Sequence, residues 1–274
     1  MSNTVQNKRI LKLKKTIFIL LGLYVMIGAS LYFIQEKLLF HPSVLPTDYT
    51  YQFSEPFEEF FLKADDGAVI NAIHFKIENP KGVILYFHGN AGDLSRWGTI
   101  AEFFVKQQFD VFIMDYRTYG KSTGVLSEEA LYKDAQMCYD HLLKYYNAAT
   151  ITMYGRSLGT GIATYLASKN KAKQLILETP YYSMIDMAHY RFPIFPVKYL
   201  LKYKLPTHEF IMDVQCPITI FHGTDDSVVP FDSGKKLFDS LSNHRAKFIQ
   251  IDGGHHNDLM EYESYHKALK PLLY

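Results

Sequence analysis

Residues 150–163 read Thr-Ile-Thr-Met-Tyr-Gly-Arg-Ser-Leu-Gly-Thr-Gly-Ile-Ala, an apolar run that ends at Gly155 and continues with helical spacing after Ser157. This order predicts a strand, a sharp turn and a helix, with the Ser157 hydroxyl exposed at the sheet edge. Glycines two residues before and after the serine avoid collisions in the bend. The helix beginning near Leu158 offers unpaired N–H groups beside the hydroxyl. These surroundings suit a nucleophilic serine, because negative charge develops next to it during attack on a carbonyl.

The same pattern also occurs in ordinary glycine-rich turns, so the rest of the chain must show whether Ser157 is catalytic. The chain has 274 residues and 48% hydrophobic content, enough for one large α/β domain or two small ones with a substantial core. Its net charge of +1 hides five basic residues before position 16, where there is no acid, so the remainder is slightly acidic. This balance gives no indication of nucleic-acid binding.

Two cysteines, Cys138 and Cys216, form neither a disulfide framework nor a metal-binding spacing. Burial as free thiols is the simpler expectation, and a single bridge between them is the alternative. The chain has no His-Glu-x-x-His pattern, so the sequence implies no metal, and it implies no cofactor either.

The amino-terminal segment predicts a membrane anchor. Residues 17–34 run for 18 residues without a charge, which as a helix spans roughly 27 Å, close to the thickness of the hydrocarbon layer. A cleaved signal peptide is the competing interpretation, with residues 28–30 as a weak cleavage site. Five basic residues precede the run, so the charge bias predicts a cytoplasmic amino terminus and a catalytic domain on the other side. We expect residues 1–35 to form this basic terminus and anchor.

An extended linker is expected over residues 36–55, followed by a single domain over 56–274. Short apolar runs bounded by Gly, Asp or Pro alternate with segments of helical spacing, which predicts a mostly parallel sheet flanked by helices. Strands are expected at 57–63, 68–77, 83–87, 111–114, 151–154, 175–177, 218–221 and 248–251, the first two as a hairpin. Helices are expected at 93–107, 127–146, 158–169, 231–241 and 258–272. Ser127 has the character of a helix cap.

Three groups of loops after predicted strands carry suitable chemistry. The loop 87–93, Phe-His-Gly-Asn-Ala-Gly-Asp, can present a backbone N–H, and the turn at Ser157 offers the N–H of Leu158. The third group contains the acids of loop 221–230 and the histidines of loop 252–258. A nucleophile, an acid and a base therefore occur in the order Ser, Asp, His, each at a strand end where α/β sheets bind ligands.

From about residue 57 to 274 the chain resembles the α/β-hydrolase superfamily. It is most similar to the membrane-anchored serine hydrolases related to the protein depalmitoylases. The resemblance rests on Phe-His-Gly-Asn-Ala-Gly at 87–92, Asp-Tyr-Arg at 115–117, Gly-Lys-Ser at 120–122, His-Asn-Asp at 256–258, and Glu-Lys-Leu-Leu-Phe-His-Pro at 36–42. Thr118 departs from the pattern, because relatives often have glycine there.

The resemblance also selects between neighbouring candidates. It favours Asp226 over Asp225 as the acid, and His256 over His255 as the base. His256 would take the proton from Ser157 and deliver it to the leaving group, while Asp226 fixes the imidazole tautomer.

The backbone N–H groups of Asn90 and Leu158 would form the oxyanion hole. His88 and His222, each in a Phe-His-Gly turn, are expected to hold loops rather than to react. Gly-Lys-Ser at 120–122 is similar to the end of a phosphate-binding loop. However, Asp115 stands where that motif needs glycine, so no nucleotide is expected.

A small helical cap is expected at about 181–213, where apolar residues alternate with basic ones. It is either a lid that lines an acyl pocket and faces a membrane, or an amphipathic pair of helices packed on the sheet. The sequence therefore predicts a membrane-anchored serine hydrolase that cleaves an ester, thioester or amide through an acyl-enzyme at Ser157. A peptidase of the same fold and an inactive domain used as a binding module are the alternatives. The sequence leaves the oligomeric state open.

Overall fold

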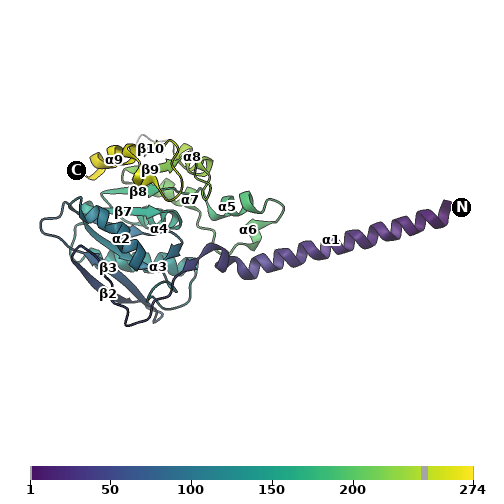
Figure 1. Cartoon of the computed structure of the whole chain (residues 1–274), viewed down its shortest axis with the longest axis horizontal. Coiled ribbons are helices and arrows are strands. Elements are labelled where there is room, and N and C mark those ends of the chain that lie inside the picture. Colours follow the sequence, from purple (N-terminus) through teal and green to yellow (C-terminus); the bar gives the residue numbers. More distant parts are fainter. Residues whose placement is uncertain (1, 242–245, 274) are drawn as a thin grey trace.

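A mixed sheet of eight strands forms the centre of the computed structural model, which describes residues 2–241 and 246–273 (Figure 1). The spatial order is β2-β3-β6-β4-β7-β8-β9-β10, in which β2 and β3 form the expected hairpin. β3 also pairs antiparallel with β6, and the pairs from β6 to β10 are all parallel. The strands are β2 (Phe57–Lys63), β3 (Val69–Phe75), β4 (Val83–Phe87), β6 (Asp110–Met114), β7 (Ile151–Arg156), β8 (Gln174–Glu178), β9 (Ile218–Gly223) and β10 (Ala246–Ile251).

Helices cover both faces of this sheet, which confirms the expected fold class. Side chains of successive residues on a strand point to opposite faces, so Leu85 and Tyr86 of β4 belong to two different apolar clusters. One cluster includes residues of α3, α4 and α8, and the other includes residues of α2 and α9. These helices are α2 (Leu94–Val105), α3 (Glu128–Leu142), α4 (Leu158–Lys169), α8 (Phe231–Asp239) and α9 (Glu263–Leu269). Cys138 and Cys216 are both buried free thiols.

Helix ends follow local chemistry in most places. Ser127 caps α3 by accepting a hydrogen bond from the N–H of Ala130 at 3.1 Å. The expectation of one continuous helix over 258–272 is wrong: 3₁₀ turns at Leu259–Glu261 and Lys270–Leu273 flank the short α9. The break lies at Tyr262, whose backbone is extended and whose hydroxyl donates to the carbonyl of Gly253 at 2.7 Å.

Helix α1 (Ser2–Leu39) extends away from the sheet (Figure 1). It is longer than the expected span of 17–34 and continues without a break past Glu36. Within it, residues 6–39 contain a window apolar enough to cross a membrane, and only 6% of that window is buried in the protein. A retained anchor and an amino-terminal signal sequence both meet this description.

Residues 36–55 were expected to form a linker, but much of this segment packs on the domain. Its first residues complete α1, and β1 (His41–Pro42) pairs in parallel with β5 (Ala91–Gly92), the strand that follows Asn90. Phe40 and Tyr51 are 5% and 4% exposed, so the segment contributes to both apolar clusters. The sequence missed this docking because two-residue strands leave no periodic signal.

Short helices occupy the region expected to form the cap. They are α5 (Met184–Arg191), α6 (Val197–Leu200) and α7 (Thr207–Phe210), followed by a 3₁₀ turn at Ile211–Asp213. α5 and α6 lie on the side of the domain from which α1 leaves (Figure 1). This arrangement brings the cap next to the last turns of α1.

Candidate active site

The turn between β7 and α4 has the shape that its glycines predict. Ser157 has φ 49° and ψ −116°, a positive-φ backbone conformation that residues other than glycine rarely adopt. A Cβ on Gly155 would lie 2.5 Å from the carbonyl oxygen of Gly159, and one on Gly159 would lie 2.1 Å from that of Phe87. Both positions therefore exclude any larger residue. The strain at Ser157 is of the kind that clusters at functional sites.

Three side chains from distant loops form one hydrogen-bonded chain beside this turn. The Nε2 atom of His256 lies 2.9 Å from the Oγ of Ser157. The other ring nitrogen of His256, Nδ1, lies 2.7 Å from Oδ2 of Asp226. Because a carboxylate only accepts, Nδ1 carries a proton and Nε2 is free to accept the hydroxyl proton of the serine. All three residues are largely buried.

Asp226 is held as an anion. Its Oδ1 accepts two backbone N–H groups, from Val228 and Val229, each at 2.9 Å. His222 approaches Oδ2 at 3.5 Å and also donates from Nε2 to the carbonyl of Val229 at 3.0 Å. Burial alone would raise the pKa of the Asp226 carboxyl, but these contacts and the one from His256 hold it well below its ordinary value.

The neighbouring acid and histidine point elsewhere. Asp225 is exposed, and its carboxylate accepts from the hydroxyl of Thr224 at 2.9 Å. His255 is exposed as well, with Nδ1 3.0 Å from the backbone carbonyl of Asp225. The geometry therefore connects Ser157 with Asp226 and His256, and it leaves the two alternatives outside the chain.

The two residues predicted to donate backbone N–H groups to an oxyanion, Asn90 and Leu158, line the same cavity as Ser157. Leu158 is the first residue of α4, where an N–H has no partner within the helix. Asn90, which lines the same cavity as Ser157 and Leu158, belongs to the loop after β4. That loop is close to the serine, because a Cβ on Gly89 would lie 3.8 Å from the Ser157 Cβ. Both residues predicted to supply oxyanion donors thus lie beside Ser157.

The buried His88 fixes the peptide that carries the Asn90 N–H. Its Nδ1 donates to the carbonyl of Gly89 at 2.6 Å. The C=O and N–H of a trans peptide point in opposite directions, so this contact sets the direction of the Asn90 N–H. Nε2 of His88 lies 3.4 Å from Asp115. Burial raises the pKa of the Asp115 carboxyl above its ordinary value, despite the opposing effect of His88.

Arg156, whose part the sequence analysis did not foresee, connects the turn to the histidine loop. Its Nε lies 3.1 Å from Glu178 Oε1, and its Nη2 donates to the carbonyl of Asn257, next to His256, at 3.1 Å. The other oxygen of Glu178 accepts from the hydroxyl of Tyr154. The only sequence signal was an arginine and a glutamate at the ends of two strands expected to be buried.

A cavity of about 250 Å³ opens at Ser157. Most of its lining is apolar and comes from the cap, from Val228 and Val229, and from α1. Among the described residues that line it, none is Asp or Glu. Its one charged residue, Arg191, donates to the carbonyls of Ser227 and Val228. The arrangement places a serine hydroxyl, an imidazole nitrogen that can accept its proton, and a mostly apolar cavity side by side.

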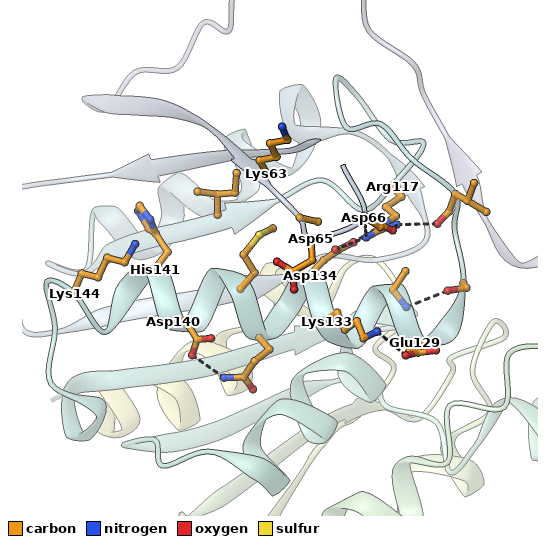
Figure 2. Close-up of a pocket in the computed structure, with 17 residues that line it drawn as sticks. Lys63, Asp65, Asp66, Arg117, Glu129, Lys133, Asp134, Asp140, His141 and Lys144 are labelled. Atoms are coloured by element: carbon orange, nitrogen blue, oxygen red, sulfur yellow. Dashed lines mark hydrogen bonds and ion pairs between the residues drawn. The ribbon is translucent and has the colours of Figure 1, made fainter. Parts of the chain in front are cut away.

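A larger cavity, of about 700 Å³, lies between α3 and the turn of the β2–β3 hairpin (Figure 2). Figure 2 shows Arg117 between Asp66 and Asp134, and Lys133 paired with Glu129. This cavity contains none of the three hydrogen-bonded residues at Ser157. In the described ranges, no group of three or more His, Cys, Asp or Glu side chains is placed to hold a metal ion.

Comparisons with known proteins identify similar chains. A family model described as serine aminopeptidase, S33, matches residues 78–212. The uncharacterized membrane protein YNL320W of Saccharomyces cerevisiae is 30% identical over 226 residues, which cover 80% of each chain. Alpha/beta hydrolase domain-containing protein 17C of Xenopus tropicalis is 28% identical over 223 residues, 79% of this chain and 69% of that one.

Solved structures share the fold. The Pyrococcus furiosus esterase Pf2001 superposes with a TM-score of 0.67 and 16% identity, over 85% of this chain and 98% of that one. An α/β hydrolase from Vibrio vulnificus superposes with a TM-score of 0.65 and 21% identity, over 78% and 81% of the two chains. At these identities the likeness concerns the fold alone.

Proposed function

The chain belongs to the α/β-hydrolase superfamily, and from this premise we propose that it is a membrane-anchored serine hydrolase whose nucleophile is Ser157. The observation that carries the proposal is the hydrogen-bonded chain from Ser157 through His256 to Asp226, at 2.9 and 2.7 Å. Its geometry matches the requirements for activating a serine hydroxyl.

The reaction follows from the proton positions. His256 accepts the hydroxyl proton at Nε2 while the Ser157 oxygen attacks the substrate carbonyl, and a tetrahedral oxyanion forms. The imidazolium, stabilised by Asp226, then gives that proton to the leaving group, and the carbonyl re-forms as an acyl-enzyme. Water repeats the cycle: His256 takes one proton from it, its oxygen attacks the acyl carbon, and Ser157 leaves with the returned proton. The products are an alcohol, thiol or amine and a carboxylic acid.

The N–H groups of Asn90 and Leu158 would bind the oxyanion in both half-reactions. Loss of one such donor typically raises the barrier by about 3 kcal/mol. His88 acts on this step through the Gly89 peptide and does not contact the substrate. We assign it as a positioning residue.

The cavity favours an acyl group of low polarity in an ester or thioester. At about 250 Å³ it lies below the roughly 300 to 1,000 Å³ of pockets for drug-sized ligands. A serine aminopeptidase is the second candidate, favoured by the description of the matching family model. Such an enzyme must bind the free ammonium group of its substrate, which a carboxylate does best. The described lining residues include no carboxylate, so we rank this candidate lower.

We further propose that α1 anchors the protein in a membrane through residues 17–34, with the amino terminus in the cytoplasm and the catalytic domain on the other side. Support comes from the apolar window of α1 and from the five basic residues before it. Protease protection of the full chain in sealed membranes tests the orientation. If protease added to the cytoplasmic side of intact membranes digests the catalytic domain, the proposed orientation is wrong.

The function is tested with the purified full chain and a panel of p-nitrophenyl esters, acyl thioesters and aminoacyl amides. We expect kcat/KM to be highest for esters or thioesters of apolar acids and to vanish in Ser157→Ala. Preference for aminoacyl amides would favour the peptidase. Hydrolysis of no panel member would favour a domain that binds without catalysing.

A further inference from the structure

The last turns of α1 form one wall of the cavity at Ser157. Leu31, Gln35, Leu38 and Leu39 line it together with the nucleophile. The facing wall is the cap. A helix expected to serve only as an anchor is therefore part of the space in which an acyl group would lie.

Gln35 fastens the cap to this helix. Its Nε2 donates to the carbonyls of Tyr32 and Leu200, at 2.7 and 3.1 Å, and its Oε1 accepts from the N–H of Lys202 at 2.7 Å. The residue is only 5% exposed, so the amide is both buried and fully paired. Residues 200–202 are thereby held in a fixed position against α1.

A second attachment lies deeper along the helix. The hydroxyl of Tyr24 donates to the carbonyl of Ile194 at 3.0 Å, and its ring stacks on Phe195 at 4.9 Å between centroids. Tyr24 stands in the middle of the apolar run, ten residues before Ile34, which corresponds to about 15 Å along a helix. The membrane-spanning stretch cannot begin further toward the amino terminus, because Lys14 and Lys15 lie just before Thr16 and the apolar run.

If residues 17–34 span the hydrocarbon layer, the tip of the cap at 192–195 lies inside that layer as well. Its surface suits this position: the side chains of Phe192 and Ile194 are 37% and 72% exposed. A backbone carbonyl without a partner is costly in hydrocarbon, and Tyr24 supplies a partner for the one at Ile194. The cap tip thus exposes apolar side chains, and α1 provides a hydrogen-bond partner for its Ile194 carbonyl.

We propose that α1 is a working part of the substrate site. With the cap it encloses a cavity that receives a single hydrocarbon chain from the bilayer and brings the carbonyl at its end to Ser157. This inference rests on the proposed function and specifies its substrate class as acyl groups resident in a membrane. Leu31 and its neighbours on α1 then determine the acyl-chain length that the enzyme accepts.

The test compares p-nitrophenyl palmitate with p-nitrophenyl butyrate, using the full chain reconstituted in phosphatidylcholine vesicles. Leu31→Trp fills the cavity from the α1 side. Ile34→Trp is the matched control, because Ile34 lies one turn away, is 43% exposed and does not line the cavity. We expect the ratio of kcat/KM for palmitate to that for butyrate to fall about tenfold or more in Leu31→Trp and to stay at the wild-type value in Ile34→Trp.

Two further variants keep the inference testable if Leu31→Trp does not fold. Leu31→Ala enlarges the cavity without adding bulk and should raise the palmitate-to-butyrate ratio. Gln35→Leu keeps the volume but removes the fastening, and should lower the palmitate-to-butyrate ratio. Equal ratios in wild type and all α1 variants, with butyrate hydrolysis still dependent on Ser157, would overturn this inference and leave the proposed function standing. Absence of Ser157-dependent hydrolysis of either ester in the wild type would overturn both.

Discussion

The Nε2 of His256 lies 2.9 Å from the Ser157 hydroxyl oxygen, although 99 residues separate them in the chain. β7 and β10 carry these residues at their carboxyl ends, with β8 and β9 between them in the sheet. Parallel pairing brings the ends of these strands to one edge, and the loop of Asp226 follows β9. Loops at a common edge of the sheet thus bring together three side chains that lie far apart in the sequence.

Asp226→Asn should lower kcat by about 10³ to 10⁴-fold, because an amide no longer fixes the His256 tautomer or stabilises the imidazolium. Steady-state kinetics on the best ester of the panel measures this effect. Asp225→Asn is the control, since Asp225 is exposed and contacts neither residue. A loss in Asp225→Asn equal to that in Asp226→Asn would contradict the assignment.

The same carboxylate should stabilise the fold in a pH-dependent way. Its folded-state pKa is lowered, so its contribution is present above the unfolded value of about 4 and is lost as the pH falls through the folded value. The difference in unfolding free energy between wild type and Asp226→Asn should therefore stay constant from pH 7 to about 4.5 and shrink below that. Chemical denaturation at several pH values measures it. If the difference in unfolding free energy grows toward acid pH, the folded-state pKa of Asp226 is raised and the prediction is wrong.

His88→Ala should lower kcat by about tenfold to a hundredfold with little change in KM, because it misdirects the Asn90 N–H without removing it. His88→Asn, which can still donate to Gly89, should recover part of the loss. His189→Ala is the control, since that histidine is exposed. A matching loss in kcat and gain in KM, with no recovery in His88→Asn, would indicate a structural role only.

Arg156→Met should lower the free energy of unfolding by about 3 to 5 kcal/mol, because it leaves the buried Glu178 without its positively charged partner. The double variant Arg156→Met, Glu178→Leu should recover much of that loss. Lys76→Met, at a surface pair with Glu58, provides the comparison and should change stability by no more than about 1 kcal/mol. Additive losses in the double variant would contradict a coupled pair.

Thr118→Gly should raise the free energy of unfolding by about 1 kcal/mol. Thr118 is exposed and has φ 75°, a conformation in which a β-branched side chain is strained and glycine is not. The loop thus keeps the backbone expected for glycine although the residue differs. Thr118→Ala retains the Cβ and should gain much less. Equal melting temperatures for the glycine and alanine variants would contradict the strain.

Much of the fold could be predicted because local rules and packing agree. The strands of the parallel sheet read as short apolar runs since both faces are buried, and the glycines around Ser157 are dictated by collisions that their Cβ atoms would make. The order of serine, aspartate and histidine along strand ends also followed from the pattern, whereas the choice of Asp226 and His256 rested on the family resemblance. Their roles in catalysis remain predictions for experiment.

The contacts of α1 could not be predicted in the same way. An apolar helix face shows that it avoids water, but lipid and the cap satisfy that need equally well. Gln35 and Leu200 are 165 residues apart, and no periodicity connects them. Tyr24, a polar group in the middle of an apolar run, was the one available signal. The part of Arg156 was missed for a related reason, since Glu178 and the Asn257 carbonyl, its two partners, lie far from it in the sequence. His88 was expected to hold its loop, but the Gly89 carbonyl it contacts has no sequence signature.

The most direct test of the central claim is labelling of the full chain by a fluorophosphonate, with the modified residue located by mass spectrometry. We predict that the wild type and Ser227→Ala, which changes an exposed serine next to Asp226, are labelled on Ser157. Ser157→Ala and His256→Ala should remain unlabelled. Labelling that persists in Ser157→Ala, or an unlabelled wild type under conditions that label a control hydrolase, would contradict the account.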